Sequence, residues 1–364
     1  MLRARDAVRT LPSYHPPLAG RNGLRLDFNE NTAGCSLRVL ERLRSTSVEQ
    51  LSKYPEREPI EAIAADFLKV NPSEVLLTNG VDEAIHLLCE TYLEPGDEAL
   101  IVVPTYSMYR IYVMAAGAQL ISVLLGEGFR LSAAAVTSRI TQRTRLIAIA
   151  NPNNPTGSVV AREDVLHIAR AAPDAAMLVD EAYFEFYGQT MLKGWHESPN
   201  IFVSRTFSKA YGLAGLRIGV LAGDAEQMRN VRLVSSPYNV NAIALACLPD
   251  ALGDQAYISQ YVDEVRETRA RLEKALEANG IQCWPSQANF VLARVGSSQA
   301  DSARFVEEMR RRGILVRDRS SDYGCDGCVR ITCGPREHAD QLLTALSEAF
   351  KELGGGVVQG VSRL

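Results

Sequence analysis

Short apolar runs recur along the first two thirds of the chain and alternate with stretches long enough for helices. Runs that are apolar on successive residues are typical of strands buried on both faces, as in a parallel sheet covered by helices. The pattern therefore predicts an α/β fold with a mostly parallel central sheet. The seven runs lie at 75–77, 99–103, 119–124, 146–150, 176–179, 201–203 and 218–221.

Helical periodicity precedes the first of these runs and dominates after the last. Leucines at 37, 40 and 43 predict a helical face over 36–49, and a second amphipathic stretch covers 58–70. Beyond about residue 222, a long charged helix is predicted over 257–279, with Gly280 ending it. Further strands and helices then predict a smaller α+β domain, with strands at 288–295, 313–317 and 328–332 and helices at 300–312 and 336–352.

These segments predict a division into two domains with irregular ends. We expect an N-terminal arm over residues 1–30, a large domain over 31–250, a small C-terminal domain over 251–353 and a flexible tail over 354–364. A length of 364 residues is enough for one large domain and one smaller domain.

Composition narrows the functional classes. A net charge of −4 provides no basic surface for nucleic acid. No apolar stretch approaches the roughly 18 residues of a membrane span, and the first residues lack the apolar core of a signal peptide. We therefore expect a cytosolic protein whose partners are small molecules.

The seven cysteines are an odd number spread along a long chain, which favours reduced thiols over disulfides. Cys325, Cys328 and Cys333 lie close enough in sequence to ligate a metal or to act as a dithiol. A zinc site usually needs a fourth ligand, and no candidate is evident nearby. We therefore expect no metal and interpret this spacing as coincidental.

Four segments at the ends of predicted strands carry polar side chains suited to chemistry. Residues 76–85 run from a strand through a glycine turn into a helix, which is an arrangement that binds anions. Residues 151–157, Asn-Pro-Asn-Asn-Pro-Thr-Gly, present amide groups directly after the strand predicted at 146–150. Asp180 ends an apolar strand, where a carboxylate requires a cationic or hydrogen-bonding partner.

The fourth segment, residues 204–219, contains Lys209, one of only six lysines in the chain. Thr206 and Ser208 supply hydroxyl donors beside it, and Arg217 supplies a guanidinium whose two parallel donors suit a phosphate. A reactive amine, a strand-end carboxylate and two phosphate-binding elements match the needs of pyridoxal phosphate.

Several motifs resemble the fold-type I, pyridoxal-phosphate-dependent aminotransferases of classes I and II. They are Asn-Pro-Asn-Asn-Pro-Thr-Gly at 151–157, Asp-Glu-Ala-Tyr at 180–183 and Ser-Lys-Ala-Tyr-Gly-Leu-Ala-Gly-Leu-Arg-Ile-Gly at 208–219. The resemblance extends from about residue 14 to 346. It implies a large domain with a mostly parallel central sheet and a smaller α+β domain.

The resemblance also implies a role for each matching residue. Lys209 would hold the cofactor covalently and move a proton, and Asp180 would keep the ring nitrogen protonated. The ring's phenolate oxygen would bind Asn154 and Tyr183, and Tyr106 would stack on the ring. The phosphate would be held by Val81, Asp82, Thr206, Ser208 and Arg217.

A narrower resemblance, to family members that act on histidinol phosphate, implies transamination between glutamate and a phosphorylated ketone. Arg330 and Arg317 would bind the anionic groups of the substrate, and Tyr14 would close over it. Tyr54 would reach the cofactor phosphate of a neighbouring subunit, which implies a homodimer with shared sites. Thr32 and Pro335 depart from the family pattern, as does the cysteine-containing loop at 319–328, and these departures lie on the substrate side.

Three alternatives remain open at this stage. An aromatic or broad-range aminotransferase and a threonine-phosphate decarboxylase would use the same cofactor lysine. A non-catalytic sensor that binds pyridoxal phosphate would usually carry a helix-turn-helix domain, for which the chain has no spare residues. A nucleotide-dependent dehydrogenase is disfavoured because no Gly-X-Gly-X-X-Gly motif follows an early strand.

Overall fold

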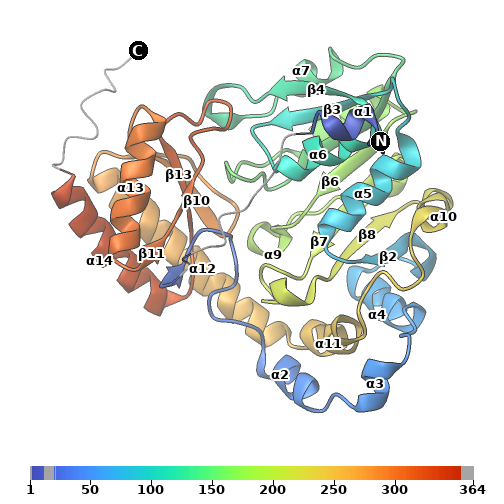
Figure 1. Cartoon of the computed structure of the whole chain (residues 1–364), viewed down its shortest axis with the longest axis horizontal. Coiled ribbons are helices and arrows are strands. Elements are labelled where there is room, and N and C mark those ends of the chain that lie inside the picture. Colours follow the sequence, from blue (N-terminus) through green and yellow to red (C-terminus); the bar gives the residue numbers. More distant parts are fainter. Residues whose placement is uncertain (1, 12–19, 21, 354–364) are drawn as a thin grey trace.

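The computed structural model describes residues 2–11, 20 and 22–353. Its largest element is a seven-stranded sheet in the order β2-β8-β7-β6-β5-β3-β4 (Figure 1). All strands except β8 run parallel to one another, and β8 is antiparallel to both of its neighbours. The strands are β2 (Val75–Thr78), β3 (Glu98–Val103), β4 (Gln119–Leu124), β5 (Thr144–Ala150), β6 (Ala176–Asp180), β7 (Ile201–Thr206) and β8 (Gly219–Gly223).

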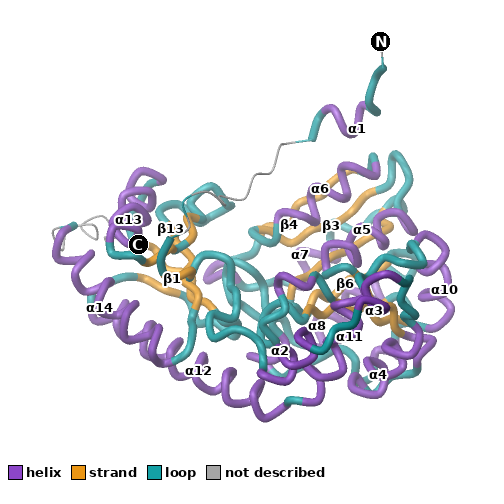
Figure 2. Tube along the Cα trace, turned by 60° about the horizontal axis from the view of Figure 1, so that its bottom comes forward, coloured by secondary structure: helices purple, strands orange, loops and turns teal. Residues whose placement is uncertain are grey.

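Helices cover both faces of this sheet because its central strands are apolar on both faces (Figure 2). One face packs on α5 (Val81–Tyr92), α6 (Ser107–Ala116) and α10 (Ala225–Val234). The other face packs mainly on α4 (Glu58–Leu68), α7 (Ala133–Thr137), α8 (Arg162–Ala171) and α11 (Ala242–Gly253). The prediction of a mostly parallel, helix-covered sheet is therefore confirmed. The edge strand β4 differs, because most of its residues are partly buried or exposed.

A second, smaller body follows the long helix α12 (Gln255–Ala278). Its antiparallel sheet has the order β12-β13-β10-β9, and a two-stranded parallel pair joins β1 (Leu24–Arg25) to β11 (Ile314–Leu315). The boundaries proposed for the domains stay a prediction. The remaining elements of this body are β9 (Gln282–Cys283), β10 (Phe290–Arg294), α13 (Gln299–Arg311), β12 (Arg317–Asp318), β13 (Cys328–Thr332) and α14 (Arg336–Glu352).

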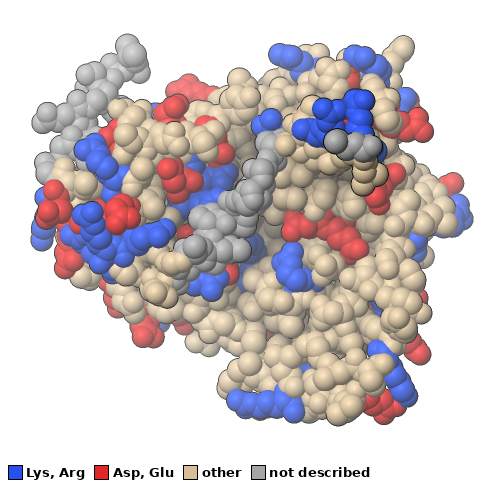
Figure 3. Space-filling model, viewed as in Figure 1, with Lys and Arg blue, Asp and Glu red and all other residues tan. Residues whose placement is uncertain are grey.

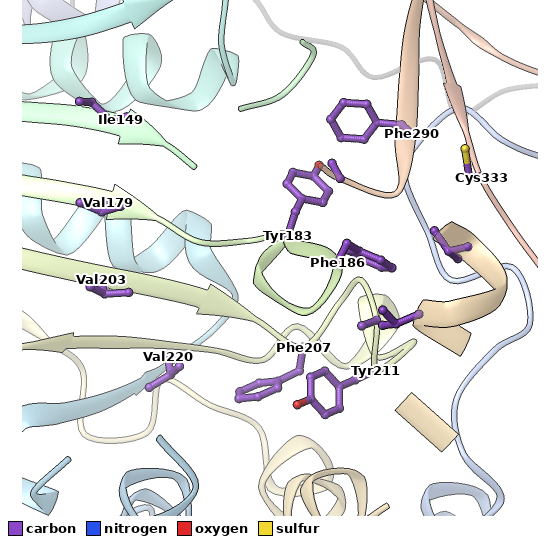
Figure 4. Close-up of a cluster of buried hydrophobic side chains, with 14 of the residues drawn as sticks. Ile149, Val179, Tyr183, Phe186, Val203, Phe207, Tyr211, Val220, Phe290 and Cys333 are labelled. Atoms are coloured by element: carbon purple, nitrogen blue, oxygen red, sulfur yellow. The ribbon is translucent and has the colours of Figure 1, made fainter. Parts of the chain in front are cut away.

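One hydrophobic core continues from the large sheet into the smaller body. Ile149, Val179 and Val203 lie side by side on neighbouring strands in Figure 4, and the aromatic rings lie beyond the strand ends. The ring of Tyr183, which follows β6, meets the ring of Phe290 on β10 edge to face, with centroids 5.1 Å apart. This packing brings the small sheet against the carboxyl ends of the parallel strands.

The N-terminal segments depart from the predicted pattern. The single helical face expected over 36–49 is wrong, because α2 (Leu37–Arg44) ends and α3 (Val48–Ser52) begins after a new cap. Ser47 accepts a hydrogen bond from the Gln50 backbone, and the Gln50 side chain accepts one from Ser47, a reciprocal cap that starts a helix. A short helix, α1 (Asp6–Arg9), lies within the expected irregular arm. Another short helix, α9 (Phe184–Tyr187), completes the fold together with the 3-10 helices. None of the helices in the described ranges is long and apolar enough to cross a membrane.

Candidate active site

The carboxyl edge of the large sheet brings the predicted residues together. The parallel strands end there, and β8 begins there because it runs in the opposite direction. In open α/β sheets this edge is where ligands bind. A cavity of about 620 Å³ lies at this edge and extends to the small sheet. Its lining includes the predicted residues Val81, Asp82, Tyr106, Asn154, Asp180, Tyr183, Thr206, Ser208, Lys209, Arg217, Arg317 and Arg330.

Asp180 provides a buried carboxylate at the end of β6. Its side chain accepts hydrogen bonds from the Tyr109 hydroxyl at 2.6 Å, the Ser204 hydroxyl at 3.1 Å and the Ala182 backbone at 3.1 Å. Burial raises the pKa of Asp180 to about 6, although these donors act to lower it. The carboxylate is therefore ready to pair with a cation that enters the cavity.

Lys209 provides an amine in the same cavity. It follows β7, and its Nζ donates a hydrogen bond to the Phe28 carbonyl at 3.0 Å. Desolvation, with a smaller contribution from the positive charge of Arg330, lowers the pKa of Lys209 to about 8. A much larger fraction of this amine is neutral near pH 8 than of an ordinary surface lysine, and the neutral amine is the nucleophilic form.

The amino end of α5 and Arg217 form an anion cradle. No described side chain caps this helix, so the N–H groups of its first turn face the cavity region without a capping acceptor. Gly80, with φ of 77°, permits close approach, because a Cβ there would lie 2.6 Å from a guanidinium nitrogen of Arg217. The Ser208 hydroxyl is buried and has no hydrogen-bond partner among the described residues. A bound phosphate would supply the missing acceptor.

Asp82 orients the groups around this cradle. Its carboxylate pairs with Arg217 at 3.1 Å and accepts a hydrogen bond from the Tyr106 hydroxyl at 2.8 Å. The Thr206 hydroxyl accepts a hydrogen bond from the Ser208 backbone at 3.1 Å, which shapes the turn before Lys209. These contacts place the phosphate-binding groups on one side of the cavity.

The small sheet places arginines on the opposite side of the cavity. Arg330 is buried, and it donates to the Asn154 side-chain oxygen at 2.5 Å and to the Asp27 carbonyl at 2.6 Å. Burial, followed by the charge of the nearby Arg319, lowers the pKa of Arg330 to about 10, so it stays charged at neutral pH. The Arg317 guanidinium lies 5.5 Å from the centre of the Phe28 ring.

Two predicted residues are not placed in this cavity. Tyr54 is 78% exposed and stacks on Tyr238, with ring centroids 4.2 Å apart. It does not line the cavity of its own chain. Tyr14, which was expected to close over the substrate, lies outside the described residues.

Several residues at this site were not among those predicted from the sequence. Tyr109 binds Asp180, and Asn29 donates a hydrogen bond to the Tyr183 hydroxyl at 2.8 Å. Arg319 lines the cavity beside Arg317. Tyr109 and Asn29 fall within the part of the chain that resembles the family, and this resemblance was the sequence signal that could have identified them. The spacing Arg-Asp-Arg at 317–319 indicates a second arginine on the same strand face.

No metal site is found in the part of the chain that the structure describes, where no three His, Cys, Asp or Glu side chains are grouped suitably. Cys325, Cys328 and Cys333 are free, buried thiols. The cavity instead combines an amine, a buried carboxylate, an anion cradle and cationic groups. This donor set fits pyridoxal phosphate, whose aldehyde, ring nitrogen and phosphate need these three kinds of partner.

The fold and the cavity define an α/β enzyme of the pyridoxal-phosphate type. The chain belongs to the aminotransferase class I and II family, whose model matches residues 21–346. A histidinol-phosphate aminotransferase of Caldanaerobacter subterraneus subsp. tengcongensis is 37% identical over 81% of this chain and 83% of its own length. One of Paracoccus denitrificans is 36% identical over 91% of this chain and 90% of its own.

A solved structure supports the same relationship. The histidinol-phosphate aminotransferase of Sinorhizobium meliloti, in complex with pyridoxal-5'-phosphate, superposes with a TM-score of 0.89. It is 25% identical, and the match covers 97% of this chain and 99% of the other.

Asp180→Asn should stabilise the cofactor-free protein at neutral pH, because it removes a buried charge. Since the pKa of Asp180 is raised to about 6 by folding, against about 3.9 in an unfolded chain, wild-type stability falls as the pH rises through this window. The free energy of unfolding of the variant, minus that of wild type, should be about 2–3 kcal/mol larger at pH 7 than at pH 4. Urea unfolding at both pH values measures this difference.

Asp174→Asn serves as the control for this experiment, because Asp174 is exposed just before the same strand. A difference between Asp180→Asn and wild type that stays constant from pH 4 to pH 7 would contradict the account of Asp180.

Proposed function

We propose that this protein is a pyridoxal-phosphate-dependent aminotransferase of histidine biosynthesis. It converts L-histidinol phosphate and 2-oxoglutarate to imidazole acetol phosphate and L-glutamate. The names of the relatives described above support this choice of substrate. The observation that carries the proposal is that one cavity is lined by Lys209 and Asp180 together with Arg317 and Arg330.

When bound, pyridoxal phosphate supplies an electron-accepting ring that stabilises negative charge at the substrate carbon. Asp180 would hold a proton on the ring nitrogen through its buried carboxylate. Lys209 would hold the cofactor covalently and move the proton at the substrate carbon, for which a pKa of about 8 is well suited. Asn154 and Tyr183 would bind the ring's phenolate oxygen, and Tyr106 would pack against the ring.

The remaining residues form two separate anion sites, one for the cofactor phosphate and one for the anionic groups of the substrates. Val81, Asp82, Thr206, Ser208 and Arg217 form the cofactor phosphate site. Arg317 and Arg330 bind the anionic groups of the two substrates, since a guanidinium matches a carboxylate or a phosphate equally well in shape.

We place the protein in the cytoplasm as part of this proposal. Its seven cysteines are all free thiols, the state that a reducing compartment maintains.

Purified protein should form glutamate from 2-oxoglutarate when histidinol phosphate is the amino donor. Lys209→Ala should lower this rate by about 10²–10⁴-fold or more, because it removes the proton-transferring amine. Coupled glutamate detection measures both rates. An exposed lysine provides the matched control, and Lys69→Ala should retain wild-type activity.

The same preparation separates the alternatives. Turnover of phenylalanine without histidinol phosphate would favour an aromatic or broad-range aminotransferase. Carbon dioxide released from threonine phosphate would identify a decarboxylase, and cofactor binding without any turnover would identify a sensor.

We also propose a homodimer with shared active sites. Large apolar side chains are exposed along α2, α3 and the segments that adjoin them. In Figure 3 the surface of this lower lobe is uncharged between charged groups at its left and right ends. Exposed apolar patches of this kind are typical of protein interfaces. A second copy of the chain is the partner that the family resemblance implies, and it would bring Tyr54 to the other cofactor. The exposed residues are Leu37, Leu40, Val48, Leu51, Tyr54, Leu233, Val234 and Tyr238.

Leu51→Asp should convert the proposed dimer largely to monomer. The substitution removes a buried leucine from each subunit and buries a charge, which together cost about 3–6 kcal/mol or more of association free energy. Sedimentation equilibrium measures the mass of wild type and variant. Leu124→Asp is the control, since Leu124 is similarly exposed at the sheet edge on β4. A monomeric wild type, or a Leu51→Asp dimer of unchanged stability, would contradict the proposal.

A further inference from the structure

Three arginines of the small sheet lie on one face and line the cavity that contains Lys209. Arg317 and Arg330 are directly opposite each other on β12 and β13, so their side chains share a face. The Arg319 N–H donates to the Cys328 carbonyl at 2.9 Å, which continues the pairing beyond β12. Because side chains alternate along a strand, Arg319 lies on the same face as Arg317.

Arg319 is held in place by its own turn. It forms an ion pair with Asp322, whose backbone N–H donates to the Arg319 carbonyl at 3.0 Å. The Arg319 side chain is only 15% exposed. A partly buried guanidinium fixed by a carboxylate loses little conformational freedom when it binds a second anion.

Arg330 carries a positive charge that its hydrogen bonds do not neutralise. Arg330 donates hydrogen bonds to two neutral oxygens, one from the Asn154 side chain and one from the Asp27 backbone. Burial lowers the pKa of Arg330, and the charges of Arg319 and Arg317 lower it further. The three guanidinium groups therefore repel one another, and a bound anion with more than one charge would relieve this repulsion most.

We propose that Arg319 binds the phosphate group of the substrate together with Arg317, and that it determines the preference of the cavity for a phosphate over a carboxylate. This inference rests on the proposed function. A phosphate monoester carries a charge of about −1.5 to −2 near pH 7, whereas the side-chain carboxylate of glutamate carries only one negative charge. A second guanidinium therefore strengthens phosphate binding more than carboxylate binding. Asp322 acts as the positioning residue for Arg319.

The test compares two half-reactions of the cofactor-loaded enzyme by stopped-flow absorbance. For Arg319→Gln, the histidinol phosphate concentration that gives half-maximal rate should rise about 10–100-fold, because one charged hydrogen-bonding group is lost. The corresponding glutamate concentration should change by less than about 5-fold. Arg319→Lys, which keeps the charge and loses the paired donors, should lie between wild type and Arg319→Gln.

Two controls make the result specific. Arg229→Gln replaces an arginine whose side chain is 72% exposed on α10 and should leave both half-reactions unchanged. Asp322→Asn should weaken the response to histidinol phosphate in the same direction as Arg319→Gln, with an unchanged maximal rate. The glutamate half-reaction shows that each variant is folded. Equal effects on both substrates, or no effect on histidinol phosphate, would overturn the inference.

Failure of the proposed function would look different. In that case wild type would react with glutamate and not with histidinol phosphate. Inhibition of the glutamate half-reaction by inorganic phosphate would then test Arg319 independently. A higher inhibition constant in Arg319→Gln would support the phosphate site, and an unchanged constant would overturn it.

Discussion

The burial of charge at the end of a parallel sheet is the constraint on which the rest of the site depends. Asp180 is 5% exposed, and a carboxylate so far from water is costly unless donors or a cation meet it. Tyr109 and Ser204 donate hydrogen bonds to Asp180 that offset part of this cost. The pKa of Asp180 nevertheless stays raised, so the carboxylate favours a positively charged partner. A protonated ring nitrogen would be such a partner, and the same desolvation keeps the Lys209 amine reactive.

The large sheet and the smaller body contribute different residues to the cavity at this edge. The large sheet and its loops supply the groups suited to the cofactor. Arg217 is among them because it lies just before the reversed strand β8, whose first end lies at the carboxyl ends of the other strands. The small sheet supplies the arginines that face the substrate side. The shared core, in which Tyr183 packs on Phe290, fixes the two sets relative to each other. The groups suited to the cofactor and the arginines of the cavity therefore come from different parts of the chain.

Much of this arrangement could be predicted from the sequence because it follows from local patterns. Buried apolar runs located the strands. Asp180 directly follows the run at 176–179, and Lys209 lies in the turn after β7. Other features depend on distant contacts and leave no local signal: an apolar run does not reveal that β8 is antiparallel, and the bond from Tyr109 to Asp180 spans 71 positions. The break between α2 and α3 does have a local signal, because Ser47 and Gln50 are typical of a helix cap. The leucine spacing instead favoured one helical face over 36–49.

We propose above all that Lys209 is the residue that holds pyridoxal phosphate. Borohydride treatment of the cofactor-loaded protein should trap this covalent bond, and peptide mass spectrometry should then find the cofactor on Lys209. Because the chain has only six lysines, each can be examined separately. The account predicts modification at Lys209 and its loss in Lys209→Ala. Modification at another lysine, or at none after incubation with the cofactor, would contradict it.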